Sequence, residues 1–292
     1  MYKYACGILL LCIGISLSGE ERNKLISGIT LAGLVIACLA IYQYLFGFGH
    51  LWNYVNKENI LSPFTLDYIA RKRPFATFVT PNALAGYLAM ICVLGLGRKN
   101  KILFVIPIAL ALLLTKSLGA LLSIVLGLTV YFYLKGSLKK RNALLLMGLL
   151  LIFGGILISR TASQQPHTQP AFSLGMRLNY WQDTLRIIKA HPVIGVGVGN
   201  FNLMYSRYAH NSYLQVWAEM GILGIMALLW LVIALVKPAL KNIKDAKKTA
   251  LPLITAAVVF LIHNFLDFTF FLPEVSLIWW VVLGLTNASR LE

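Results

Sequence analysis

His210 is the residue in this sequence whose type and surroundings best suit proton transfer. It stands beside Asn211, just before a long apolar run. Aromatic and basic side chains precede it: Tyr205, Arg207 and Tyr208. An imidazole has a pKa of about 6.5, so a histidine at a membrane boundary can accept a proton at neutral pH. Histidine and tyrosine are also ordinary interfacial anchors, and spacing alone therefore favours a structural histidine over a catalytic one.

Three further ionisable residues, Glu219, His263 and Asp267, lie within apolar runs. Charge buried in hydrocarbon is costly, so each is a candidate functional group. His263 and Asp267 are four residues apart and would share a helix face, which makes a mutual hydrogen bond easy. A polar clamp between helices and a catalytic or proton-carrying role are both compatible with this pair. Glu219 is half a turn out of phase with His210, so the two do not share a face.

The glycine run Gly195–Gly199 superficially resembles a dinucleotide-binding loop. It lacks the preceding strand and the downstream acidic residue that such a site needs. The sequence therefore favours a loop in which the backbone approaches a neighbour closely.

The four cysteines all lie inside apolar runs, without CxxC spacing: Cys6, Cys12, Cys38 and Cys92. They are typical of small buried hydrophobic residues. The sequence predicts neither a disulfide framework nor a zinc site, and no metal is expected.

These candidate groups belong to a chain whose composition is that of a membrane protein. Of the 292 residues, 59% are hydrophobic and only 12% are charged, against roughly 45–50% apolar in soluble proteins. The formal charge of +16 raises the question of nucleic-acid binding. No basic stripe is interleaved with aromatic residues on a polar domain, and basic loops are what membrane topology requires, so no nucleic-acid partner is expected.

Hydropathy predicts an all-α polytopic transmembrane bundle of about nine helices, because the apolar runs are continuous and lack the alternation of barrel strands. The predicted helices are 5–18, 25–47, 81–97, 102–115, 118–134, 143–159, 212–236, 251–271 and 275–286. The two runs that flank Lys116 are short, and an alternative is one bent helix, which would move all later segments to the other side.

Lysine and arginine counts predict the orientation of the bundle. Fifteen of the 26 basic residues fall on one side, in short loops or the tail: Arg22, Lys24, Arg98, Lys99, Lys101, Lys135, Lys139, Lys140, Arg141, Lys237, Lys241, Lys244, Lys247, Lys248 and Arg290. Most of the others lie in two long loops, about 48–80 and 160–211, which the positive-inside rule discounts. The short loops are therefore predicted to be cytoplasmic, and both long loops and the N-terminus to face outward.

Residues 1–18 also resemble a signal peptide, with Lys3 ahead of an apolar stretch and small residues at its end. Cleavage there requires a cytoplasmic start, which would invert the topology and oppose the positive-inside count. An outward N-terminus is unusual for a multi-span protein, and it suggests that preceding helices are missing from this sequence.

The two outward loops are the only polar stretches large enough to carry chemistry. The first ends in the basic run Arg71-Lys72-Arg73-Pro74. The second begins with a segment rich in Gln, Ser and Pro, and then repeats apolar residues at three- and four-residue steps from Leu178 to Ala190. This pattern predicts a helix that lies in the interface or on the bundle.

A family resemblance assigns roles within these loops. The pair His210-Asn211 is followed, after nine residues, by Gly221-Ile222-Leu223-Gly224. This pattern resembles the signature of the O-antigen ligase family, a His-Asn or His-Ser pair followed by Gly-x-x-Gly. The stretch from Arg73 to Leu88 is similar to the family's Arg-x-x-Gly-Thr-Phe and Pro-Asn-x-Leu-Ala-x-Tyr-Leu block, with Ala76 in place of the usual glycine. The family's Arg-x-x-x-Trp element resembles Arg177 with Trp181, and its Pro-x-x-Gly-x-Gly element resembles residues 192–197.

The resemblance covers about residues 71–285, and it also implies a membrane topology. Members usually have twelve helices and a large periplasmic loop between the ninth and tenth. Loss of three initial helices would leave nine, an outward N-terminus and a large outward loop between the sixth and seventh, which is the arrangement that the charge count predicts. We therefore expect a single membrane domain over 1–292, with an O-antigen ligase-like region over 71–285 in which the loop 160–211 is inserted.

The resemblance implies a glycosyltransferase of the bacterial cytoplasmic (inner) membrane, with its active site facing the periplasm. It would take a glycan from an undecaprenyl-diphosphate-linked donor and join it to a hydroxyl of lipid A-core or of another glycan or protein acceptor. His210 would be the general base, and Arg73 and Arg177 would bind the diphosphate without metal or cofactor. Lesser candidates for substrate contact are Arg71, Arg207, Asn211 and Tyr213.

Three other functions stay open at this point. A polymerase that extends a lipid-linked glycan uses the same donor with a different acceptor. A transporter would use Glu219, His263 and Asp267 as a relay near the membrane midplane. A structural scaffold would tolerate replacement of His210.

Overall fold

The structure, a computed structural model, describes residues 2–58, 68–137, 140–161, 170–241 and 247–286. Within these ranges the chain is all-helical and contains no strand, which confirms the predicted class. The helices are α1 (Tyr2–Ser16), α2 (Gly19–Tyr42), the π-helix η1 (Gln43–Gly47), α3 (Phe48–Lys57), α5 (Pro81–Gly95), α6 (Lys101–Leu114), α7 (Leu118–Leu134), α8 (Lys140–Thr161), α9 (Pro170–Ala190), α10 (Ser212–Lys241), α11 (Lys247–His263), the 3-10 helix η3 (Thr269–Phe271) and α12 (Pro273–Leu285).

Each apolar run predicted from hydropathy coincides with one of these helices over most of its length. Within the described ranges, three helical stretches are long and apolar enough to cross a membrane: Gly19–Lys57, Asn142–Ser159 and Ser212–Lys237. The other apolar helices there are shorter than a typical span, with 10–17 residues each. The number of nine spans therefore stays a prediction.

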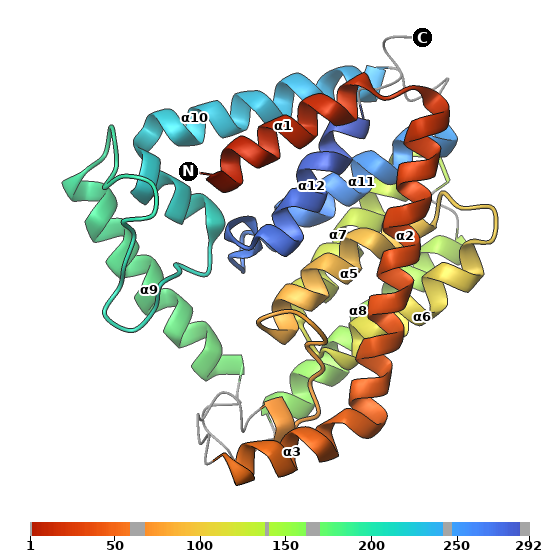
Figure 1. The fold of residues 1–292 in the computed structure, drawn as a ribbon, viewed down its shortest axis with the longest axis horizontal. Coiled ribbons are helices and arrows are strands. Elements are labelled where there is room, and N and C mark those ends of the chain that lie inside the picture. Colours follow the sequence, from red (N-terminus) through yellow and green to blue (C-terminus); the bar gives the residue numbers. More distant parts are fainter. Residues whose placement is uncertain (1, 59–67, 138–139, 162–169, 242–246, 287–292) are drawn as a thin grey trace.

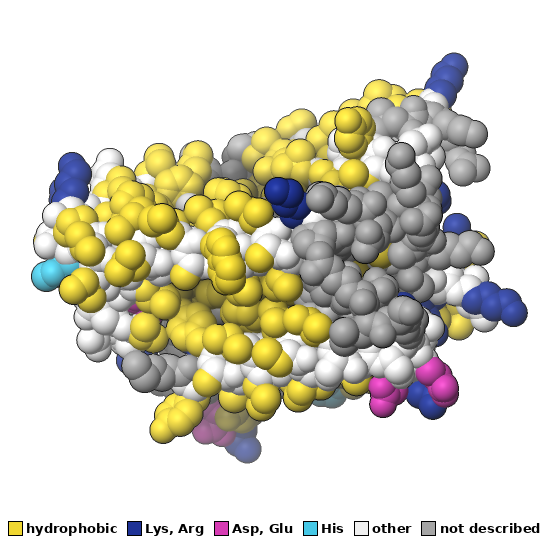
Figure 2. Space-filling view, turned by 90° about the horizontal axis from the view of Figure 1, so that it is seen from above, with side chains coloured by type: hydrophobic (Ala, Val, Ile, Leu, Met, Phe, Trp, Pro, Cys, Tyr) yellow, Lys and Arg dark blue, Asp and Glu magenta, His cyan; other side chains and the backbone are white. Residues whose placement is uncertain are grey.

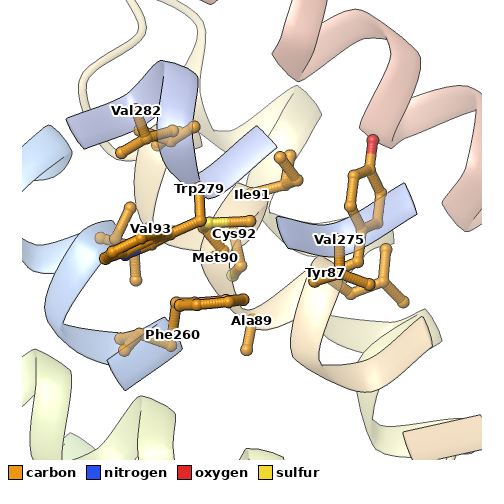
Figure 3. Close-up of a cluster of buried hydrophobic side chains, with 14 of the residues drawn as sticks. Tyr87, Ala89, Met90, Ile91, Cys92, Val93, Phe260, Val275, Trp279 and Val282 are labelled. Carbon is orange, nitrogen blue, oxygen red and sulfur yellow. The ribbon is translucent and has the colours of Figure 1, made fainter. Parts of the chain in front are cut away.

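The core lies between helices that are distant in the sequence. Figure 1 shows α5, α7, α11 and α12 in the middle of the bundle, with α2 and α6 on one side and α9 on the other. Nearly every residue of α5 is buried, and Met90 from α5 lies close to Phe260 of α11 and Trp279 of α12 (Figure 3). The Phe260 and Trp279 rings stack with their centroids 5.0 Å apart.

Small residues allow α1 to pack closely along α12. A Cβ at Gly7 would overlap the Trp280 indole, and Gly14 meets Gly284 backbone to backbone. Such close approach through small residues is the usual packing of helices in membranes.

The outer surface of the bundle is apolar. In Figure 2 hydrophobic side chains cover much of the visible face, and Lys and Arg side chains project mainly from its margins. Large exposed apolar side chains continue along α8 and α10: Leu144, Leu151, Ile158, Leu229, Trp230 and Ile233. A contiguous apolar surface of this kind, together with helices of spanning length, is that of a membrane protein.

The helices on either side of Lys116 are separate, and they form a hairpin. Lys116 has a positive φ of 54°, and the chain reverses there. Tyr131, near the end of α7, packs in a cluster with Leu96, just beyond the end of α5 and close to the start of α6. Both ends of the hairpin therefore lie at one end of the bundle, and the alternative of a single bent helix is wrong.

Two other predicted helices are interrupted. The run 251–271 is not one helix, because α11 ends at His263 and a turn follows. The Asn264 carboxamide accepts a hydrogen bond from the Phe270 amide at 2.8 Å, which folds the chain back. Hydropathy missed this turn because its residues are mostly apolar.

The run 212–236 is broken at Gly221, where φ is 67° and ψ is −170°. The Ile222 amide leaves the helical pattern and donates to the Pro192 carbonyl at 3.0 Å. A Cβ at Gly221 would overlap the Val193 carbonyl, so this close approach requires glycine.

Segments that the charge count assigns to one side of the membrane meet at one end of the bundle. Arg73 and Ser117 come from two predicted outward segments, and both line one cavity near the start of α5. Beyond the other end of α5, Arg98 lies with Asn23, so two predicted inward segments meet there. This grouping agrees with the predicted topology, and the assignment of the cavity end to the periplasm stays a prediction.

Candidate functional site

A cavity of about 340 Å³ lies among α5, α7, α8, α9 and the turn after α11. Arg73 and Arg177, which are far apart in the sequence, both line it. The other lining residues are Asn82, Ser117, Leu118, Gly119, Leu122, Phe153, Ser173, Leu174, Leu266 and Asp267. The cavity is thus apolar toward α7 and α8, and its two cations come from α9 and from the segment before α5.

Arg73 is held rigidly at this cavity. Its side chain is buried, with only 7% exposed. The Nε atom donates to the Thr115 carbonyl at 2.9 Å, and Nη2 donates to the Asn82 carboxamide at 2.9 Å. These bonds orient the guanidinium before any ligand arrives, which lowers the entropic cost of binding an anion.

The turn after Arg73 depends on Gln43 in the π-helix η1. The Gln43 carboxamide oxygen accepts hydrogen bonds from the Phe75 and Ala76 amides, at 2.9 and 2.8 Å. Ala76 has a φ of 48°, in the left-handed region. The glycine that the motif resemblance leads one to expect at this place would adopt that conformation without a Cβ penalty.

Arg177 projects from α9 into the same cavity. Its Nη1 donates to the Ser173 hydroxyl at 2.8 Å, one helical turn earlier. Its Nε is buried and has no hydrogen-bond partner. A buried donor without an acceptor is costly, and an oxygen of a bound ligand would satisfy it.

His210 lies between aromatic rings beside this cavity. Its imidazole stacks on Tyr180 at a centroid distance of 5.6 Å and meets the edge of Phe268 at 4.7 Å. Its Nδ1 is buried without a hydrogen-bond partner. Burial lowers the pKa of His210 to about 4; nearby Asp267 raises this pKa, and nearby Arg177 lowers it further. The imidazole is therefore neutral at pH 7, the form that accepts a proton.

The backbone of His210 is fixed from both sides. Its φ of 52° is left-handed. On one side the Ala209 amide donates to the Gln215 carboxamide at 3.1 Å, and Gln215 donates in turn to Glu219 at 3.0 Å. On the other side, the Asn211 side chain caps α10, accepting hydrogen bonds from the amides two and three residues later.

The start of α10 is also tied to the turn after α11. The Ser212 hydroxyl donates to the Asn264 carboxamide at 2.6 Å, and the Ser212 amide donates to the Asn264 carbonyl at 2.9 Å. Through this connection, Phe268 is held against His210.

The glycine run packs against α10. Gly199 donates its amide to the buried Glu219 carboxylate at 3.0 Å, and Gly197 donates to the Glu219 carbonyl at 2.9 Å. A Cβ at Gly195 would lie 2.5 Å from the Glu219 backbone. The expectation of a close backbone approach is confirmed, and Glu219 serves this packing.

The lesser candidates lie in different settings. Asn211 is a helix cap, and the Tyr213 hydroxyl donates to the Leu261 carbonyl at 2.7 Å, joining α10 to α11. The Arg71 carbonyl accepts a hydrogen bond from Lys116 at 2.9 Å. Arg207 is exposed, and it is not among the residues that line the cavity.

Asp267 is a cavity residue that the sequence did not identify as such. Its carboxylate lies 3.9 Å from the His263 Nε2, so the two are close but not hydrogen-bonded. They are not on one helix face, since α11 ends at His263. Asn82 and Ser117 also line the cavity, and neither was predicted as a site residue. The Pro-Asn motif could have pointed to Asn82, whereas no motif includes Ser117.

Comparison with known proteins gives one family. No curated protein matches the chain in sequence. The matched family segment begins within α6 and ends within α10, and so it includes Arg177, His210 and Gly221. Arg73 precedes it. The resemblance inferred from the motifs is confirmed: residues 102–229 of this chain match the family model of the O-antigen ligase.

Proposed function

We propose that this protein transfers a glycan from an undecaprenyl-diphosphate carrier to an acceptor hydroxyl at the periplasmic face of the inner membrane. The family match supports an enzyme of the O-antigen ligase or polymerase kind. The observation that carries the more specific proposal is the meeting of Arg73 and Arg177 in one cavity, beside a neutral, half-buried His210.

The cavity suits a lipid diphosphate. Guanidinium groups bind phosphate oxygens bidentately and keep their charge when buried, so Arg73 and Arg177 can hold the diphosphate and stabilise its charge as the glycosyl bond breaks. The apolar wall formed by Leu122 and Phe153 gives the polyprenyl chain a surface toward the bilayer. The two arginines offer this stabilisation without a metal ion.

His210 then acts as the general base. It takes the proton of the acceptor hydroxyl while that oxygen attacks the anomeric carbon, and the undecaprenyl diphosphate leaves with the bonding electron pair. A single displacement of this kind inverts the anomeric centre. General-base assistance typically contributes about 10²–10⁴-fold to such a rate.

Donor binding also adjusts the base. Before the donor binds, burial and the nearby Arg177 hold the pKa of His210 at about 4, where it is a weak base. A diphosphate on Arg177 would offset the guanidinium charge and raise the pKa of His210 toward its ordinary value. The imidazole would thus become a stronger base only when the donor is present.

Glycan transfer by the full chain in lipid nanodiscs tests this proposal. The assay supplies a fluorescent undecaprenyl-diphosphate-linked glycan, with and without purified lipid A-core, and compares wild type with Arg177→Ala. We expect transfer that survives a chelator and a rise of tenfold or more in the donor KM of Arg177→Ala, because a charge-assisted hydrogen bond is lost.

Lys189→Ala is the matched control, because Lys189 is an exposed cation on the same helix. It should leave the donor KM unchanged. The products separate the two candidate acceptors, since a polymerase gives a ladder without lipid A-core and a ligase gives a product only with it. Loss of activity on chelation, or an unchanged donor KM in Arg177→Ala, would refute the mechanism.

A further inference from the structure

We infer that a second groove on α9, lined by polar and aromatic side chains and by Met176, binds the acceptor as a carbohydrate, an inference that rests on the proposed transfer reaction. The groove has a volume of about 470 Å³. Its lining includes Asn179, Tyr180, Gln182, Asp183, Arg186 and Tyr205. None of these residues lines the arginine cavity.

The two sites lie on different faces of α9. Ser173 and Arg177, four residues apart, face the arginine cavity, whereas Tyr180 and Asp183 continue along the groove. Asp183 is six residues beyond Arg177, which places it about 120° away around a helix of 3.6 residues per turn. The helix therefore separates the proposed donor diphosphate from the groove.

His210 connects the two sites. Its ring stacks on the groove residue Tyr180, with an interplanar angle of 20°. The charges of Arg177 and Asp267, which line the arginine cavity, also shift the pKa of His210. A base that removes the acceptor proton while the donor bond breaks must lie between acceptor and donor. His210 is not among the lining residues of either site, but it adjoins Tyr180 of the groove and lies near Arg177 of the cavity.

The charge of the groove differs from that of the cavity. Asp183 and Arg186 form an ion pair at 2.7 Å, so the charged groups of the groove balance each other. A diphosphate has little to gain there, whereas the cavity offers it two arginines. The groove therefore fits a ligand of low net charge.

The side chains of the groove suit a polyhydroxylated ligand. The carboxamides of Asn179 and Gln182 can each donate and accept hydrogen bonds, as sugar hydroxyls do. Tyr205 is 76% exposed, and it offers an aromatic face on which the apolar side of a sugar ring can lie. Carbohydrate is the ligand class that uses both features.

Saturation-transfer NMR with the full chain tests this site directly, without turnover. The protein is held in lipid nanodiscs free of sugar detergents, and the probes are maltotriose, mannotriose and chitotriose. We expect at least one trisaccharide to bind wild type, and Tyr205→Ala to weaken that binding tenfold or more. Tyr205→Phe keeps the ring and should bind nearly as well as wild type.

Met204→Ala is the matched control, since Met204 is 86% exposed beside Tyr205 but outside the groove lining. It should bind the trisaccharide as wild type does. Failure of all three probes, or binding that survives Tyr205→Ala, would overturn the inference. If binding depends on Tyr205 while the donor assay gives no transfer, then the groove stands and the proposed function fails. If transfer occurs but no trisaccharide binding depends on Tyr205, then the proposed function stands and the groove fails.

Discussion

At the scale of single residues, the burial of His210 predicts an unusual titration. Because the folded pKa of about 4 lies below the ordinary value, the imidazole should stay neutral as the pH falls through 6.5 and gain its proton only near pH 4. NMR of histidine-labelled protein measures this midpoint, and His210→Gln identifies the signal by removing it. A midpoint near 6.5 would contradict the burial of this side chain.

Inorganic pyrophosphate should move that midpoint upward. The anion on Arg177 would cancel part of the charge that disfavours the imidazolium, so the pKa of His210 should rise. The same titration with pyrophosphate present measures the change. In Arg177→Ala the midpoint without ligand should already be higher than in wild type, and pyrophosphate should move it less. If pyrophosphate leaves the titration midpoint of wild type unchanged, then His210 does not interact with the anion site and the prediction is wrong.

At the scale of elements, the turn between Arg73 and α5 is strained at Ala76. Ala76→Gly removes a left-handed Cβ penalty of about 1–2 kcal/mol, and the greater freedom of glycine in the unfolded chain costs about 0.4–1 kcal/mol. The net gain in stability is therefore expected to be about 0.8 kcal/mol. A thermal unfolding midpoint above that of wild type in the same nanodiscs checks this. An unchanged or lower midpoint would show that the turn carries no strain.

Replacement of the glycine at the break in α10 should destabilise the protein. In Gly221→Ala the added Cβ meets the Val193 carbonyl and the backbone keeps a positive φ. We expect a loss of about 2 kcal/mol or more in the free energy of unfolding, with a lower thermal midpoint. Gly148→Ala is the control, since a Cβ there meets nothing within 4 Å. Equal midpoints for the two variants would argue against the close approach.

The elements also show what the sequence could and could not predict. Apolar length predicted the helices well, because burial in lipid requires continuous apolar runs. It missed the end of α11 at His263, because the residues of the following turn are mostly apolar and the Asn264 side chain folds that turn locally. It missed the break at Gly221, because that break depends on a hydrogen bond to the distant Pro192. The sequence also does not reveal that the Asn211 side chain bonds to the backbone of α10 and the Tyr213 side chain to that of α11, and the substrate contacts of these two residues stay a prediction.

At the scale of the whole molecule, the predicted topology places the cavity on the outer side of the cytoplasmic membrane. In a background without the four native cysteines, Arg207→Cys should react with a membrane-impermeant maleimide added to spheroplasts, and Lys99→Cys should not. Both positions are exposed, so access depends only on the side of the membrane. Labelling of Lys99→Cys without labelling of Arg207→Cys would invert the topology.

The alternative functions differ in which residues they require. A transporter would depend on Glu219, His263 and Asp267 as a mid-membrane relay. In the structure Glu219 instead binds the glycine run and Gln215, and Asp267 lines the cavity with the two arginines. A scaffold would tolerate loss of His210, whereas a transferase would not.

The rate of transfer by His210→Ala, measured at saturating donor, therefore tests the central claim most directly. Wild type and variant are compared in the nanodisc assay with the fluorescent donor. Because the imidazole acts on the acceptor proton, we predict a kcat lower by about 10²–10⁴-fold with a donor KM close to that of wild type. A His210→Ala protein that folds and transfers glycan at the full rate would contradict the account.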